Sequence, residues 1–312
     1  MANQLPVVGA AMPSRLLAEH REWLIAEQRD LELQDPVFSE TLDSDWQPLV
    51  RHVRDQLDGY TGRLGLHGPF MSLSLLAYDP KIRAVVTERL RQGIALAAEL
   101  GASHMVIHSP FIFFGSPFLP HAPSAGLQEQ IALIAATLEP IVPLAEQARC
   151  TLVIENIQDT NPAPLLAVVR SFNSESVRMS LDTGHALITH RVGGPTPDQW
   201  VREAGPLLGH IHLQDSDGQL DRHWTPGDGS LNWYALFEAL GGLTHSCGTR
   251  LRSAAAPRTS PLAAWRVRAA AGVVGAAATR RRGRPAPAQA RGSGPGWGRR
   301  PHPARALGSD RG

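Results

Sequence analysis

Short apolar runs and longer amphipathic runs alternate along the first 243 residues of the chain. Short runs that are apolar almost throughout are typical of parallel strands buried on both faces. The predicted strands are Pro6–Met12, Asp30–Gln34, Arg63–Pro69, His104–Ser109, Thr151–Asn156, Val177–Asp182 and Gly209–Gln214. Strands that alternate with helices in this way predict parallel β/α construction.

The longer runs predict helices at Lys81–Leu100, Leu127–Ala148 and Leu231–Leu240. The first of them has apolar residues spaced three and four apart, as on one helical face: Ile82, Val85, Val86, Leu90, Ile94 and Ala97. Pro80 stands where a helix begins and Gly101 where a helix is capped at its C-terminus.

The expected fold class is therefore α/β, a (β/α)8 TIM barrel. A barrel of this kind needs eight strands. Only seven can be recognised before residue 243, so we expect the eighth β/α unit to be missing or scrambled. The predicted organisation is a metal-dependent barrel domain at residues 1–243, followed by a tail at residues 244–312.

The tail has an unusual composition. Residues 251–312 are rich in Ala, Gly and Pro and hold 13 Arg but a single acidic residue, Asp310. Such a segment has little to bury and is predicted to be disordered. It is either a basic arm, since Arg280, Arg281 and Arg282 are consecutive, or the product of a frameshift in GC-rich DNA, which the composition favours.

Charge and cysteine content narrow the function classes. The formal net charge is +1, yet residues 1–250 alone carry a balance of −11, so nucleic acid is not the expected partner. Only Cys150 and Cys247 occur, which indicates no disulfide framework. The chain shows neither an apolar run long enough for a membrane helix nor a secretory signal, so we expect no membrane partner and a cytoplasmic location.

Side chains that can bind metals recur where the predicted strands end. They are His67, His108, Glu155, Asp182 and His212, and His185 follows Asp182 by three residues. Because the C-terminal strand ends of a barrel meet at one mouth, we expect these residues to be neighbours. Mixed carboxylate and imidazole ligands suit Mn²⁺, Mg²⁺, Co²⁺ or Zn²⁺. The sequence therefore predicts a divalent metal site.

A loop after the seventh strand adds further candidates. Asp221 and His223 could supply metal ligands, and Trp224 could stack on a sugar ring. The alternative is a polar surface loop with a packed tryptophan. Asp182 likewise has the alternative of an Asx turn before Gly184, and Glu155 that of a cap on the next helix.

This ordered set resembles the xylose isomerase-like TIM-barrel superfamily, which includes sugar phosphate isomerases and epimerases and AP endonucleases of the endonuclease IV type. The resemblance covers roughly residues 5–243. In the sugar branch it implies one divalent ion on a Glu, an Asp, a His and a final Glu. Glu155, Asp182 and His212 match the first three, but no Glu follows Glu238.

In the endonuclease branch the resemblance implies three zinc ions, and eight residues match: His67, His108, Glu155, Asp182, His185, His212, Asp221 and His223. The acidic charge balance of residues 1–250 and the motif D-T-G-H at residues 182–185 favour the sugar branch.

The expected function is thus isomerisation or epimerisation of a sugar or sugar phosphate through an ene-diolate. The expected roles are acid/base catalysis for Glu155 and His185, and substrate binding for His67, His108 and Trp224. Metal binding is expected at Glu155, Asp182, His212, Asp221 and His223. The alternatives are an AP endonuclease and a barrel that is catalytically impaired because the last Glu is absent. The sequence leaves open whether the chain forms a homo-oligomer.

Overall fold

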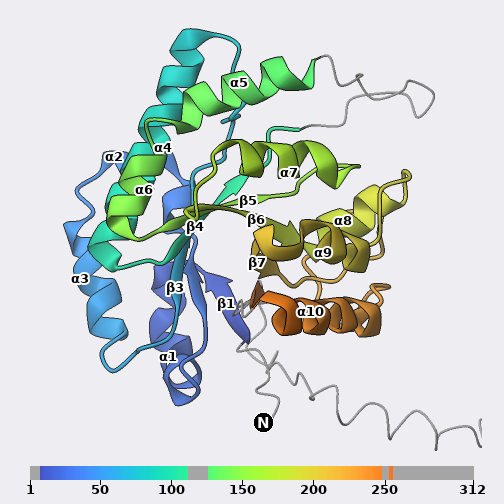
Figure 1. Cartoon of the computed structure of the whole chain (residues 1–312). Helices are drawn as coiled ribbons and strands as arrows, with labels where there is room; N and C mark the ends of the chain where they lie inside the picture. Colours follow the sequence, from blue (N-terminus) through green and yellow to red (C-terminus); the bar gives the residue numbers. More distant parts are fainter. Residues whose placement is uncertain (1–7, 112–125, 248–252, 256–312) are drawn as a thin grey trace, which may run out of the picture. The chain divides into compact units, whose positions relative to one another are not determined.

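The computed structural model describes residues 8–111, 126–247 and 253–255. Within these residues the strands form a closed, wholly parallel barrel in the order β1 to β8 (Figure 1). The strands are β1 (Val8–Met12), β2 (Leu31–Leu33), β3 (Leu64–His67), β4 (His104–His108), β5 (Thr151–Glu155), β6 (Val177–Asp182), β7 (Leu208–His212) and β8 (Ser253–Ala255). The predicted fold class is confirmed.

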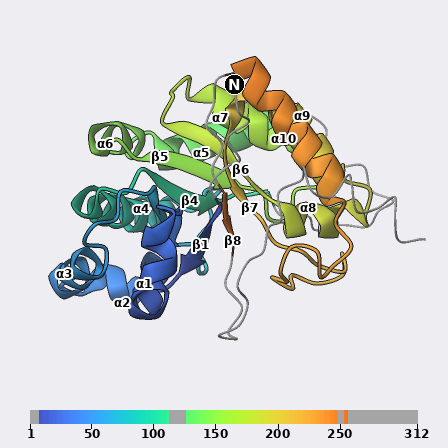
Figure 2. The same cartoon turned by 90° about the horizontal axis from the view of Figure 1, so that it is seen from below.

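Helices lie outside the strands, as the view from below in Figure 2 shows. They are α1 (Leu17–Ala26), α2 (Ser39–Asp43), α3 (Gln47–Gln56), α4 (Pro80–Leu100), α5 (Leu127–Leu138), α6 (Val142–Ala148), α7 (Pro162–Ser171), α8 (Thr183–His190), α9 (Pro197–Ala204) and α10 (Trp233–Cys247). Short 3-10 turns lie at Ser14–Leu16, Asp35–Val37 and Gly205–Leu207.

Helix α4 illustrates how the local sequence sets the element bounds. The Asp79 side chain accepts a hydrogen bond from the backbone N–H of Lys81, and Gly101 ends the helix in the left-handed conformation at φ 70°. The predicted apolar face is buried at Val86, Leu90, Ile94 and Ala97. The N-terminal part of this face is not buried, because Ile82 and Val85 are 54% and 51% exposed.

The prediction of one helix over Leu127–Ala148 is wrong. Helix α5 ends at Leu138 and α6 begins at Val142, with Pro140 in the break and Pro143 in the first turn of α6. Proline lacks an N–H and clashes with the preceding turn, which explains the interruption. Among the described residues no single helix has the length and apolar character to cross a membrane; only the α5–α6 pair, bent by 49°, meets that test as a pair.

An eighth strand, which the sequence did not reveal, is present as the three residues Ser253–Ala255. It pairs in parallel with β7 and with β1 and so closes the barrel. Helix α10 also continues to Cys247, past the predicted domain end at residue 243. The strand carries no carboxylate, and residues 256–312 of the predicted tail lie outside the described residues.

Candidate functional site

Five strands in succession end on residues that can bind a metal, and the parallel barrel brings these ends to one mouth. The mouth residues are His67 on β3, His108 on β4, Glu155 on β5, Asp182 on β6 and His212 on β7. Register pairs His108 with Glu155 and Asp182 with His212 directly across neighbouring strands. The convergence expected from the sequence is therefore present.

Glu155 is the centre of this arrangement. Its carboxylate is 2% exposed, and Oε1 lies 2.7 Å from Nδ1 of His212. Its Oε2 lies 3.6 Å from Nε2 of His108 and 3.8 Å from Nε2 of His67. Burial favours the neutral acid, but the charge and hydrogen bond of His212 outweigh it and lower the pKa of Glu155. The alternative that Glu155 caps the next helix does not apply, because Asn161 caps α7.

Asp182 has two structural roles at once. Its Oδ1 accepts the backbone N–H of His185 at 2.8 Å and so caps α8, which is the local turn considered as the alternative. The same oxygen lies 3.7 Å from Nδ1 of His185. Burial disfavours the charged imidazole, yet Asp182 and Asp221 more than compensate and raise the pKa of His185 to about 10. His185 is consequently protonated at neutral pH in the metal-free chain.

The loop after β7 contributes Asp221 and His223 beside this histidine. Oδ2 of Asp221 lies 3.4 Å from Nε2 of His185 and 2.9 Å from Nε2 of His223. Despite partial burial, these two histidines lower the pKa of Asp221. The indole of Trp224 instead lies under the Arg222 guanidinium, 5.6 Å from the ring centre, and its predicted contact with a sugar stays a prediction.

Sequence reasoning missed the amide residues that hold the mouth in place. The Gln214 amide donates to both oxygens of Asp182 at 3.0 Å and to Oδ1 of Asp221 at 2.9 Å. The Asn156 side chain accepts from the backbone N–H of Asp182. Both amides are buried, and for Asn156 its place directly after the apolar run of β5 was a signal that could have found it. Asp215, the residue after Gln214, accepts the Trp233 indole N–H and backbone N–H groups and so organises the loop.

A second polar layer inside the barrel was also missed. We call Glu32, His104, Ser180 and His210 the inner layer; they are 0%, 2%, 0% and 1% exposed. Nε2 of His212 lies 3.1 Å from both oxygens of Glu32, so this ring joins the inner layer to the mouth. Barrel interiors are usually filled by branched apolar residues. A glutamate between two leucines on β2 was the available signal.

Burial and neighbouring charges together set the pKa values of the groups in the inner layer. Burial would keep Glu32 neutral, but the charge of His212 lowers its pKa well below the usual value. Burial lowers the pKa of His104 to about 4, helped by the charge of Arg63, and also lowers that of His210. At the mouth, burial likewise lowers the pKa of His108, to about 3.

Asp159, four residues after Glu155, is a further buried acid. It accepts hydrogen bonds from the Ser109 hydroxyl at 2.7 Å and from the backbone N–H of Ile157 at 2.9 Å. Burial outweighs both bonds and raises its pKa to about 7. Strongly shifted pKa values of this kind are common among groups at functional sites.

The described side chains form three groups, within each of which the ligand atoms lie within 4.8 Å of one another. Two are at the mouth and share Glu155: one adds His67 and His108, the other Asp182 and His185. The third is Glu32, His210 and His212. Imidazole nitrogens and carboxylate oxygens in these numbers fit a divalent ion.

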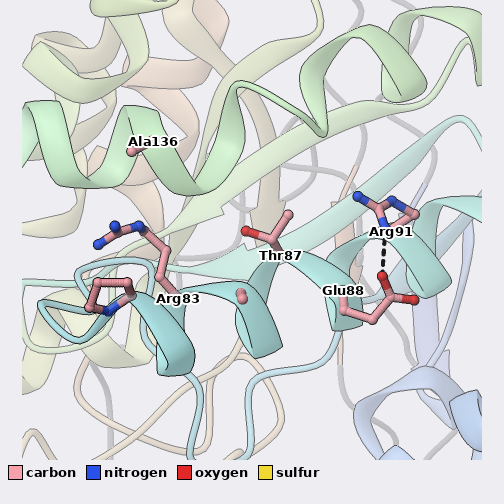
Figure 3. A pocket seen from close by; sticks show the side chains of 7 residues that line it. Arg83, Thr87, Glu88, Arg91 and Ala136 are labelled. Carbon is pink, nitrogen blue, oxygen red and sulfur yellow. Dashed lines mark hydrogen bonds and ion pairs between the residues drawn. The ribbon is translucent and has the colours of Figure 1, made fainter.

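A groove on the outside of the barrel is a different kind of feature. It lies along α4 and reaches Ala136 of α5, with the Arg83, Thr87, Glu88 and Arg91 side chains around it (Figure 3). Its cations are already engaged, since Arg91 pairs with Glu88 at 2.6 Å and Arg83 donates to the carbonyl of Ala77. The mouth is therefore the stronger candidate for chemistry.

Comparison with known proteins agrees with this fold. Residues 29–246 match the model of the xylose isomerase-like TIM barrel family. The chain belongs to this family. By sequence, it is 25% identical over 198 residues to an uncharacterized protein of Methanocaldococcus jannaschii, MJ1311, a match that spans 61% of this chain and 64% of that protein.

Two solved structures illustrate the fold of this xylose isomerase-like barrel. The TTHB071 protein of Thermus thermophilus, in crystals soaked with ZnCl₂, is 27% identical with a TM-score of 0.59, covering 77% of this chain and 98% of that one. A D-tagatose 3-epimerase-like protein is 22% identical with a TM-score of 0.63, covering 80% of this chain and 90% of that one.

Proposed function

We propose that this xylose isomerase-like barrel is a divalent-metal-dependent isomerase or epimerase of a small sugar or sugar phosphate. The observation that carries the proposal is the convergence of Glu155 and Asp182 with three histidines at one mouth. The likeness to the D-tagatose 3-epimerase-like protein supports the substrate class. The acidic balance of residues 1–250 also favours a small polar substrate over nucleic acid.

Glu155, Asp182 and His212 would hold the ion, with Nδ1 of His212 facing both carboxylates at 2.7 and 4.0 Å. A divalent ion bound there supplies Lewis acidity that polarises a sugar carbonyl and makes the neighbouring C–H more acidic. The protein also fixes the positions of the side chains that would hold the ion. The Gln214 amide fixes both oxygens of Asp182, and Asn156 fixes its backbone.

The side chains that would move protons have the charge states that a proton acceptor and a proton donor need. Glu155 is ionised and can accept the proton from the carbon beside the carbonyl. His185 is protonated and can donate to a substrate oxygen. His67 and His108 would bound the inner side of the pocket, and Trp224 would meet a sugar face from the loop.

Deuterium exchange tests this function directly. The purified chain, loaded in turn with Mn²⁺, Mg²⁺, Co²⁺ or Zn²⁺, would be incubated with ketoses and aldoses in D₂O. We expect deuterium at the carbon beside the carbonyl, together with an isomer or epimer. Incorporation should disappear in Glu155→Gln but persist in Glu129→Gln, which changes an exposed helical glutamate. Metal binding without exchange on any sugar would favour the impaired barrel, since β8 offers no carboxylate.

A second function, hydrolysis of DNA at abasic sites, is favoured by one specific observation. Asp221 lies between His185 and His223, beside the group of His67, His108 and Glu155, so the mouth has ligands for more than one ion. Cleavage of an abasic duplex with three zinc ions per chain would replace the sugar proposal. A chain that leaves the abasic duplex intact at every metal loading would exclude the endonuclease.

A further inference from the structure

Glu32 places a carboxylate deep in the barrel, where it is 0% exposed. An ionised carboxylate in such a place requires a positive partner or ligands that satisfy it. Three imidazole rings face it, from His104 on β4 and from His210 and His212 on β7. They come from strands far apart in the barrel order, so no local turn accounts for their meeting.

Two rings of the inner layer lie too far from Glu32 for hydrogen bonds. Nε2 of His104 lies 3.8 Å and Nε2 of His210 lies 3.5 Å from Oε2 of Glu32. Hydrogen bonds between nitrogen and oxygen are usually about 2.7–3.2 Å. Ligands about 2.0–2.1 Å from a tetrahedral zinc ion lie roughly 3.4 Å from one another. The ligand atoms of Glu32, His210 and His212 lie within 4.8 Å of one another, as atoms around a common centre would.

His104 gives an independent indication of a missing partner. Its Nε2 is buried and has no hydrogen-bond partner among the described residues, although it is directed toward Glu32. The chain makes room for this ring at Gly65, which stands between His104 and Glu32 in the strand register. A Cβ at residue 65 would lie 2.1 Å from Nε2 of His104.

The other ring nitrogens are held as they are in metal sites. Nδ1 of His210 lies 2.9 Å from the Ser180 hydroxyl, and Nδ1 of His104 lies 3.3 Å from the Ser103 hydroxyl. Histidine ligands commonly bond through their second nitrogen to an oxygen that fixes the ring. Both rings are thereby oriented with Nε2 toward the centre of the barrel.

We propose that the inner layer is a second metal site, in which Glu32, His210 and Nε2 of His212 hold one divalent cation of the zinc class. The fourth position faces Nε2 of His104, which has no hydrogen-bond partner among the described residues. Three nitrogens and one oxygen suit tetrahedral zinc. This site goes beyond the proposed function, because Glu32, His104 and His210 take no part in the mouth.

Metal titration of the full chain tests the inner site. Metal-free protein would be titrated with Zn²⁺, and with Co²⁺ whose visible spectrum reports tetrahedral coordination, while bound metal is counted by mass spectrometry. A mouth-disabled variant, Glu155→Gln with Asp182→Asn, isolates the inner site. We expect it to retain one ion with a tetrahedral Co²⁺ spectrum, and to lose that ion when His104→Gln is added.

Ser180→Ala in the mouth-disabled background keeps every proposed ligand and covers the case in which His104→Gln does not fold. Loss of the hydroxyl that holds His210 should weaken binding of the inner ion by about 10–100-fold. The proposal is overturned if the mouth-disabled chain binds no ion, or if Ser180→Ala and His104→Gln leave affinity and spectrum unchanged. Retention of the inner ion by a chain with no sugar activity would refute the proposed function alone.

Discussion

The mouth and the inner layer use the same residue types, yet the buried rings of His185 at the mouth and His104 in the inner layer differ in charge. At the mouth, His185 faces Asp182 and Asp221, and its pKa rises to about 10. In the inner layer, His104 shares the single carboxylate of Glu32 with two other rings and lies near Arg63, so its pKa falls to about 4. The number of carboxylates per imidazole decides the charge, since both rings are buried. His185 can therefore donate a proton at the mouth, whereas His104 in the inner layer stays neutral, as does His108 at the mouth.

Glu155→Gln should produce the largest difference in effect between the mouth and the inner layer. The amide cannot accept a proton and is a weak metal ligand, so sugar-dependent deuterium exchange should fall by at least about 10³-fold. The inner ion should remain, because Glu155 is not among its ligands. Isotope exchange and metal counting on the same preparation check both parts. Equal loss of both ions would mean that mouth and inner layer form one site.

Glu32→Gln should have the next largest effect, on stability. Glu32 is the carboxylate that faces His212 from below, and removing it leaves the charged imidazole with only its mouth partners. Breaking a buried ion pair from one side costs about 3–5 kcal/mol. Urea unfolding of metal-free protein at pH 7 measures the change. Glu88→Gln, which breaks an exposed pair with Arg91, should cost less than about 1 kcal/mol.

Asp159→Asn tests the rule that partners, not burial, set the charge. Asp159 is buried like Glu155 but accepts no hydrogen bond from a histidine, and its pKa is raised to about 7. The folded chain therefore binds an extra proton between about pH 4 and 7, and stability falls as pH rises through this window. The asparagine variant should lack that fall and be more stable than the wild type at pH 8, by about 1–3 kcal/mol. Urea unfolding at pH 5 and pH 8 would contradict this if both proteins lost stability equally.

The sequence predicted the mouth more completely than the inner layer, for a physical reason. Residues such as Glu155 and Asp182 end their strands, and parallel strands must bring their ends together. The order of these residues along the chain was therefore enough to predict that they meet. Glu32 lies within a three-residue strand, and its partners depend on register and on which face each strand turns inward. Strand β8 could not be recognised, since Ser-Ala-Ala has no apolar pattern and is fixed only by pairing with β7 and β1.

Gly65→Ala should have the smallest effect and acts on the inner layer alone. The new Cβ would lie 2.0 Å from Cε1 of His104, and this ring is only 2% exposed, so it must move. Overpacking of this kind costs about 1–3 kcal/mol. We expect a lower free energy of unfolding, together with weaker binding of the inner ion and unchanged binding at the mouth. Adding His104→Ala should recover part of the stability by vacating the space, but it should not restore the ion. If Gly65→Ala left both stability and inner metal binding unchanged, His104 would have room to turn away, and the inner layer would not be a fixed set of ligands.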